Sequence, residues 1–249
     1  MKAYLKPTPP RDVIGDVEGC YYELLALLQK LGYQLVLSSD PLPKILRLRR
    51  PGKRKVVFAG DMMNRGPHSD LVINLIMQLV KRKCAIVVKG NQELKYLKGT
   101  NPEALPTIAA VAKHGDGFVQ KVRTFIEGLP SKYETNRLIV VHGAYREDVP
   151  DDVAEKLALF GEKDGTVDKR GMPVHLNLWE TDYRGTKTII HGHTPLRDVH
   201  CRDLPSGARI VNVDTGAAFG NKLSAMRFPT LEIVSVFSLA AYSKPFEDW

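Results

Sequence analysis

The sequence has few cysteines and no long apolar run. Three cysteines, Cys20, Cys84 and Cys201, are spread over 249 residues, and no two of them form a CxxC pair. This number and spacing suggest neither a disulfide framework nor a structural zinc site. No stretch approaches the roughly 18 consecutive apolar residues of a membrane span, and the first residues lack the apolar segment of a signal peptide. We therefore expect no membrane segment, no targeting segment and a location in the reducing cytoplasm.

Acidic residues are outnumbered by basic ones, which gives a net charge of +8 and favours anionic partners such as nucleotides, polyphosphates or RNA. The densest basic segment, Lys44 to Lys55, alternates apolar and basic residues around a Pro-Gly pair, which predicts a hairpin with one basic face. Aromatic residues are absent from this segment. A solvated hairpin edge is therefore favoured over a nucleic-acid groove, and RNA binding through Lys44 to Lys55 stays an alternative.

The order of apolar and amphipathic segments predicts an α/β fold. Short apolar runs before Asp16, Asp61 and Asn91 alternate with amphipathic stretches, which is βαβαβ patterning. Residues 101–129 favour helix, residues 147–171 form a polar stretch that predicts loop, and the later apolar runs predict a mostly β second half. Without a linker or repeat, we expect one domain over residues 1–249, with a surface tail over residues 238–249.

Polar motifs follow the predicted strands in a fixed order. They are GDVEG with Asp16 and Glu18, GDMMNRG with Asp61, Asn64 and Arg65, GNQE with Asn91 and Gln92, VVHGAY with His142, and IIHGHTP with His191 and His193. Ligand sites of open α/β sheets form at the carboxyl ends of strands, where the first motifs fall. Oxygen ligands mixed with imidazoles suit a pair of divalent metal ions.

This series of motifs resembles that of the calcineurin-like metallophosphoesterases, in the branch of phosphoprotein phosphatases and diadenosine tetraphosphatases. The family motifs GDxHG, GDxxDRG, GNHE, HG and GHTP fall at Gly15, Gly60, Gly90, His142 and Gly192. Residues 210–229, IVNVDTGAAFGNKLSAMRFP, are also similar to small bacterial and phage members. The resemblance covers most of the chain. It implies a four-layer sandwich in which two mixed β-sheets are flanked by helices.

The resemblance also implies a role for each matching residue. Asp16 would hold a first metal ion, Asp61 would bridge two, and Asn91, His142 and His193 would hold the second. Glu18 is either a further metal ligand or a solvent-facing carboxylate. Arg65 would bind phosphate, Asp214 would lie near the site, and His191 would be structural. Two divalent ions are implied, Mn²⁺ first and Mg²⁺, Fe or Zn as alternatives, with a bridging hydroxide as the nucleophile.

Three positions depart from the family pattern: Glu18 replaces His, Asn64 replaces Asp, and Gln92 replaces His. The family's His and Asp form a proton-donating dyad, whereas two amides cannot deliver a proton, a loss of about 10² to 10⁴ in rate. Gln92 and Asn64 could still bond to each other or to a phosphate oxygen, or could form a purely structural pair. Relatives in the family carry basic residues near the position of Trp179, and a second phosphate-binding arginine is missing there in this sequence. Arg170 or Arg184 could take its place, and His175 is a further candidate.

The departures favour one class of substrate. Glu18 adds negative charge, which penalises dianionic phosphomonoesters, and a missing acid favours leaving groups that need little protonation. We therefore predict a metal-dependent phosphohydrolase acting on phosphodiester or phosphoanhydride bonds of nucleotides or nucleic acid. The alternative is a catalytically impaired pseudo-phosphatase that binds a nucleotide, RNA or a protein.

Overall fold

The computed structural model describes residues 9–167, 173–176 and 178–244. Its strands are β1 (Arg11–Ile14), β2 (Gln34–Leu37), β3 (Ile45–Arg49), β4 (Lys55–Phe58), β5 (Ala85–Val87), β6 (Lys132–Glu134), β7 (Leu138–Val141), β8 (Glu162–Val167), β9 (Pro173–Leu176), β10 (Thr188–His191), β11 (His200–Asp203), β12 (Arg209–Asn212), β13 (Lys222–Phe228) and β14 (Glu232–Phe237). Its helices are α1 (Tyr21–Lys30), α2 (Ser69–Lys81), α3 (Asn91–Lys98), the 3₁₀ turn η1 (Pro102–Ala104), α4 (Leu105–Ala112), α5 (Asp116–Glu127), α6 (Asp151–Phe160) and α7 (Leu178–Asp182). Within these ranges, each helix is too short or too polar to span a bilayer.

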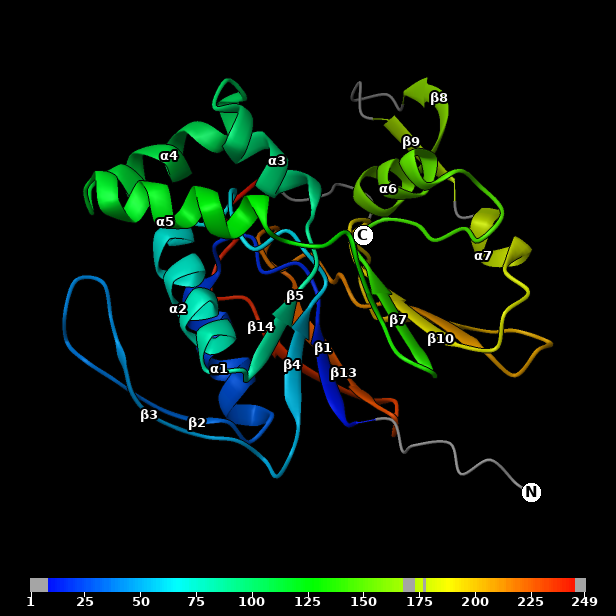
Figure 1. The fold of residues 1–249 in the computed structure, drawn as a ribbon, viewed down its shortest axis with the longest axis horizontal. Helices are drawn as coiled ribbons and strands as arrows, with labels where there is room; N and C mark the ends of the chain where they lie inside the picture. The colour runs from blue at the N-terminus through cyan, green and yellow to red at the C-terminus, as the bar shows by residue number, and fades with distance from the viewer. Residues whose placement is uncertain (1–8, 168–172, 177, 245–249) are drawn as a thin grey trace.

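Two five-stranded mixed sheets form the centre of the molecule. The first has the order β14-β13-β1-β4-β5 and the second β11-β12-β10-β7-β6. In each sheet three neighbouring strands are parallel, β1 with β4 and β5 in one and β7 with β10 and β12 in the other. Three strands run antiparallel to the parallel strand beside them, namely β13, β11 and β6. The edge strand β14 runs antiparallel to β13. The carboxyl ends of β1, β4, β7 and β10 all lie at the upper edge in Figure 1.

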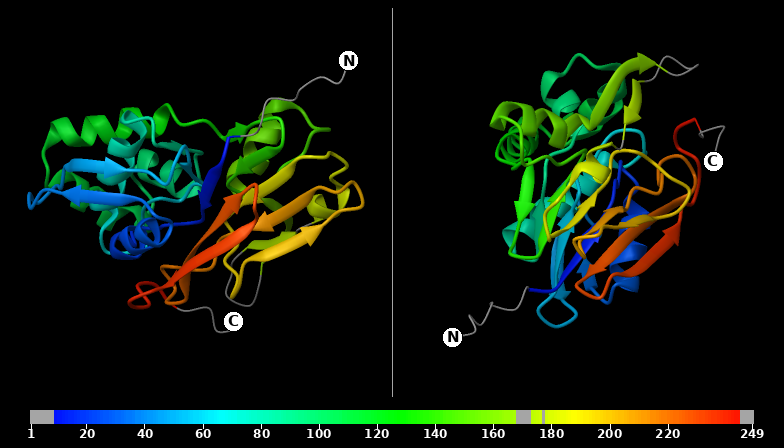
Figure 2. Two further views of the ribbon diagram at one scale, coloured as in Figure 1. Left: turned by 90° about the horizontal axis from the view of Figure 1, so that it is seen from below. Right: turned by 90° about the vertical axis from the view of Figure 1, so that its right-hand side faces the viewer.

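Alternate residues of the inner strands pack on opposite faces, and this alternation produces four layers. Val13 of β1 and Val140 of β7 belong to the apolar cluster between the sheets. Their neighbour Ile14 packs with α1 and α2 on one outer face, while Ile139 packs with α6 and α7 on the other. Figure 2 shows α1 to α5 beside the first sheet and the yellow and orange strands of the second sheet opposite. The predicted four-layer sandwich is confirmed.

The hairpin predicted around the Pro-Gly pair of the basic segment is wrong. β3 pairs antiparallel with β2, whereas β4 joins β1 and β5 in the first sheet. The reason is burial: residues 56–58 are apolar and fill the core on both faces, so β4 is a central strand. Arg54 of the basic segment bonds to the buried carboxylate of Asp12 at 2.8 Å and is therefore structural.

Two further predictions fall in the second half. The stretch 147–171, predicted as loop, contains α6 and β8. Residues 153–159 of α6 are mostly apolar and bury Ala158 and Leu159, and β8 forms by pairing with β9. The predicted tail begins as a bound segment: Tyr242 hydrogen-bonds through its backbone to Ala218 and through its hydroxyl to buried Glu23. The domain boundaries of the chain stay a prediction.

Candidate active site

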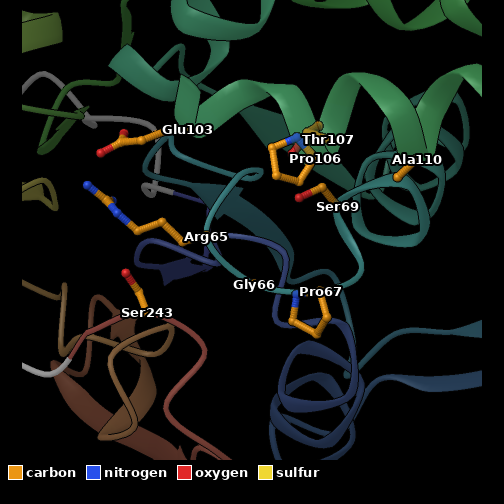
Figure 3. A pocket seen from close by; sticks show the side chains of 9 residues that line it. All are labelled: Arg65, Gly66, Pro67, Ser69, Glu103, Pro106, Thr107, Ala110 and Ser243. Atoms are coloured by element: carbon orange, nitrogen blue, oxygen red, sulfur yellow. The ribbon is translucent and has the colours of Figure 1, made fainter. Parts of the chain in front are cut away.

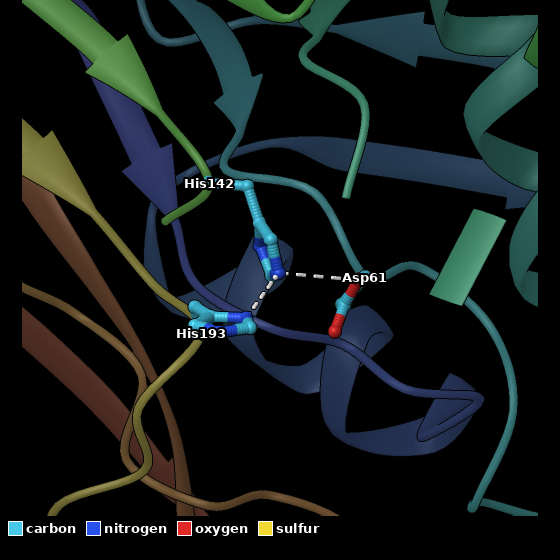
Figure 4. Close-up of side chains that lie close together, drawn as sticks. All are labelled: Asp61, His142 and His193. Atoms are coloured by element: carbon cyan, nitrogen blue, oxygen red, sulfur yellow. Dashed lines mark hydrogen bonds and ion pairs between the residues drawn. The ribbon is translucent and has the colours of Figure 1, made fainter. Parts of the chain in front are cut away.

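The predicted metal-binding side chains meet where the strands of both sheets end. Asp16 follows β1, Asp61 follows β4, Asn91 starts α3 after β5, His142 follows β7, and His193 follows β10. Figure 4 shows Asp61, His142 and His193, which come from three different loops, pointing toward one another. Residues up to 177 positions apart in the chain are thus in contact, since the backbone N–H of His193 donates to the Asp16 carboxylate at 3.1 and 3.2 Å.

The orientation of the His142 ring is fixed by the first sheet. Its Nδ1 lies 3.0 Å from the carbonyl oxygen of Ala59, so Nδ1 carries the proton and Nε2 presents its lone pair to the site. Nε2 lies 2.8 Å from Asn91 Oδ1, 3.3 Å from Asp61 Oδ1 and 2.9 Å from His193 Nδ1. Lone pairs of nitrogen and oxygen therefore converge on one point, which suits a cation.

Two groups of donors share one residue. Asp61, His142 and His193 form one group and Asp16, Glu18 and Asp61 form the other, and within each group the ligand atoms lie within 4.8 Å of one another. Asp61 can serve both groups because a carboxylate has two oxygens. The mixed oxygen and imidazole donors fit two neighbouring divalent ions.

Backbone strain is concentrated at this site. Among the described residues, seven non-glycine residues have positive φ, and five of them are the predicted site residues Glu18, Asp61, Asn64, Arg65 and His193. Such conformations cost about 1–3 kcal/mol each and persist only where the surrounding structure enforces them. The strain therefore marks these loops as shaped for the positions of their side chains.

Close approach of loops accounts for two of the motif glycines. A Cβ at Gly192 would lie 1.9 Å from Asp16 Oδ1, and a Cβ at Gly90 would lie 2.2 Å from Asp61 Oδ1. Glu93, which the sequence analysis did not single out, holds the same loops: its buried carboxylate accepts hydrogen bonds from the N–H groups of Gly90, Asp61 and Met62 at 2.8–3.0 Å. Its position in the GNQE motif was the available signal.

Burial and neighbouring negative charges raise the pKa values of the carboxyl groups at the site. Burial, together with the charge of Asp214, raises the pKa of Asp16, and burial with the charge of Glu93 raises that of Asp61. Burial also raises the pKa of Asp214 to about 6. Asp214 therefore lies within electrostatic reach of the site, as predicted, although it belongs to neither donor group.

The three altered motif positions form one network around Arg65. Glu18 accepts an ion-pair hydrogen bond from Arg65 Nη1. The far end of the Gln92 amide lies 3.1 Å from Lys95 Nζ, 3.2 Å from Arg65 Nη2 and 3.4 Å from Glu103 Oε2. Because the two nearer groups can only donate, we assign the amide oxygen to that end. The other end of the amide lies 2.9 Å from the side chain of Asn64. Of the alternatives left open by the sequence, the contact between Gln92 and Asn64 is present. Arg65 links Gln92 to Glu18.

His191 lies apart from the two donor groups. Its Nε2 is 3.6 Å from buried Glu180, and its ring meets that of Trp179 edge to face.

Of the predicted substitutes for a phosphate-binding arginine, Arg184 bonds to the carbonyl oxygens of its own turn. Arg170 and the side chain of His175 lie outside the described residues. Lys95, whose Nζ lies 3.1 Å from the Gln92 amide, was not among the site residues predicted from the sequence. A lysine on the surface of a helix belongs to no motif and therefore gives no signal.

Comparison with known proteins is consistent with this geometry. Residues 10–219 match the model of the family described as calcineurin-like phosphoesterase. Two curated relatives are named bis(5'-nucleosyl)-tetraphosphatase PrpE [asymmetrical]. The one from Halalkalibacterium halodurans is 34% identical, covering 90% of this chain and 92% of its own, and the one from Bacillus cereus strain Q1 is 35% identical, covering 90% and 93%. A crystal structure described as "a putative diadenosine tetraphosphatase" shares the fold, with a TM-score of 0.64, 23% identity and 94% and 95% of the two chains covered.

Proposed function

The chain belongs to the calcineurin-like phosphoesterase family, and from this premise we propose that it hydrolyses phosphoanhydride bonds of dinucleoside tetraphosphates. Members of this family are hydrolases that use two divalent metal ions. The relatives from Halalkalibacterium halodurans and Bacillus cereus carry the name of such a tetraphosphatase. The observation that carries the proposal is the pair of donor groups that share Asp61.

We assign the metal ligands on the chemistry of the donors. Asp16, Glu18 and Asp61 would hold one ion, and Asp61, Asn91, His142 and His193 the other. When bound, the ions activate water and neutralise charge on phosphoryl oxygens. Carboxylate, amide and imidazole together suit Mn²⁺, with Mg²⁺, Fe or Zn as alternatives. The fixed tautomer of His142 supports this assignment because its lone pair already faces the site.

The protein's own groups then determine which phosphoryl compound fits. Arg65 presents a planar guanidinium to phosphate oxygens and is anchored between Glu18 and Gln92, with Phe219 stacked 5.2 Å from it. Asn64 and Gln92 are amides and cannot protonate a leaving group at neutral pH. A nucleotide leaving from a phosphoanhydride needs little protonation, and this supports an anhydride over a phosphoserine ester as the substrate.

Two further predictions from the sequence concern the location of the protein and its binding of RNA. A location in the cytoplasm and an RNA-binding role for Lys44 to Lys55 stay predictions. The exposure of Lys44, Arg47, Arg49 and Lys53 favours the second, although in Figure 1 strand β3 lies at the end of the molecule away from the strand ends that form the site. RNA affinity that falls steeply with salt would support it, and affinity that does not change would remove it.

Hydrolysis by the purified protein tests the proposal. With Mn²⁺ present, we expect turnover of diadenosine tetraphosphate and of an aryl phosphodiester in preference to an aryl phosphomonoester. Asp61→Asn should abolish all turnover, which excludes a contaminating phosphatase. A protein that binds Mn²⁺ but hydrolyses none of the three compounds would instead be the pseudo-phosphatase.

A further inference from the structure

The ammonium group of Lys95 lies close to the guanidinium group of Arg65 at the border of the candidate active site. Lys95 lies one turn after Asn91 in α3, so the two side chains leave the same face of the helix. Lys95 Nζ is 3.1 Å and Arg65 Nη2 is 3.2 Å from the oxygen of the Gln92 amide. Two positive charges thus converge on one neutral oxygen, and each also pairs with a carboxylate, Arg65 with Glu18 and Lys95 with Glu103.

The carboxylate partner of Lys95 is easily displaced. Lys95 forms an ion pair with Glu103 in η1, where the side chains are 26% and 44% exposed. Burial raises the pKa of Glu103, but the hydrogen bond from Lys95 and the positive charges of Arg65 and Lys95 together lower it below its ordinary value, so the carboxylate is ionised at neutral pH. An ion pair this exposed contributes only about 0–1 kcal/mol, so a phosphate group can replace Glu103 at little cost.

A pocket of about 310 Å³ continues from these charges toward α4. Arg65 and Glu103 stand at one end of it, and Pro67, Pro106 and Ala110 line the other, as Figure 3 shows. Apolar surface next to a few polar groups, in a volume of this order, is typical of a site for a small organic molecule. The residues that hold the metal ions do not line this pocket, so it is available for a part of the substrate remote from the scissile bond.

From this arrangement we infer that Lys95 binds a non-scissile phosphate of a nucleoside oligophosphate and that the pocket receives the attached nucleoside. The inference rests on the proposed function, since it requires a chain of phosphates that begins at the metal centre. Arg65 and Lys95 then bind successive phosphates, and the nucleoside lies between Pro67 and Pro106. Lys95 thereby supplies the second phosphate-binding side chain, beside Arg65, for which the sequence near Trp179 offered no clear candidate.

Kinetics with matched variants test the role of Lys95. The ratio of kcat/KM for diadenosine tetraphosphate to kcat/KM for an aryl phosphodiester should fall about tenfold in Lys95→Met, as expected for one lost charge-assisted hydrogen bond. Lys95→Arg should keep most of the ratio, and Lys98→Met, exposed on the same helix, should not change it. Glu103→Gln should lower the KM for the tetraphosphate because it removes the competing anion. An unchanged ratio in Lys95→Met, or a raised KM in Glu103→Gln, would overturn the role.

Calorimetric binding to the Mn²⁺-loaded protein tests the pocket without requiring turnover. Lys95→Met should weaken binding of both tripolyphosphate and a non-hydrolysable ATP analogue, whereas Ala110→Phe, which fills the pocket, should weaken only the nucleotide. If Ala110→Phe binds the nucleotide like the wild type, the pocket assignment is wrong. If diadenosine tetraphosphate is not hydrolysed, the proposed substrate is wrong, and the binding pattern of the two variants still decides the subsite by itself.

Discussion

Glu18→Gln should shift the substrate preference toward phosphomonoesters. The ligand oxygens of Asp16, Glu18 and Asp61 lie within 4.8 Å of one another. A phosphoryl group bound there comes within about 6 Å of the Glu18 charge, and at an effective dielectric constant of about 20–40 one extra unit of negative charge on the substrate then costs about 1.4–2.8 kcal/mol. A phosphomonoester dianion carries this extra charge and a phosphodiester does not. The substitution should therefore raise the monoester-to-diester ratio of kcat/KM by about tenfold or more.

The release of Arg65 from its ion pair acts in the same direction, because a guanidinium without a carboxylate partner attracts the dianion more strongly. The assay compares an aryl phosphomonoester with the corresponding diester at saturating Mn²⁺, so that weaker metal binding does not enter. Glu127→Gln, an exposed carboxylate on α5, is the matched control. If both substrates slow by the same factor, or if the ratio stays within about twofold of wild type, the charge of Glu18 does not reach the substrate and the reasoning is refuted.

Three further predictions concern the loops and charges of the site. Gly192→Ala would place a methyl group 1.9 Å from Asp16 Oδ1 and should lower kcat/KM about 100-fold, whereas Gly117→Ala, with open space around its Cβ, should not. Glu93→Gln leaves at least one of three buried N–H groups without an acceptor. The substitution should lower the free energy of unfolding by about 1–3 kcal/mol and lower Tm in calorimetry by several degrees. An unchanged Tm would contradict the role of Glu93 in holding these loops together. Burial raises the pKa of Asp214 to about 6 and raises those of its acidic neighbours, so protonation stabilises the metal-free fold at low pH and this stability is lost as pH rises through about 6. Mn²⁺ replaces those protons, and it should therefore raise Tm more at about pH 8 than at about pH 5, with an equal rise at both values arguing against the carboxylate site.

The sequence by itself determined the first buried strands and the positions of the motif residues at their ends, and the family resemblance implied the four layers. Residues 13–14 and 56–58 are apolar without interruption, as strands buried on both faces must be, and each such run ends at a Gly-Asp or Gly-Asn turn. Because parallel strands share one carboxyl edge, the sequence alone predicts that Asp16, Asp61 and Asn91 lie near one another. Sequence also identified the altered positions Glu18, Asn64 and Gln92.

The partners of these residues depend on contacts between distant segments, and only the tertiary structure decided them. That Arg65 joins Glu18 to Gln92, and that Lys95 reaches the same amide oxygen, follows from the packing of α3 against the loop after β4. The basic segment shows the same limit: its local pattern favoured a hairpin, but burial of β4 between two strands of the first sheet gave β3 a different partner. Local sequence sets which face of a strand is apolar, whereas strand partners and ion-pair networks are selected by the free energy of the whole packed core.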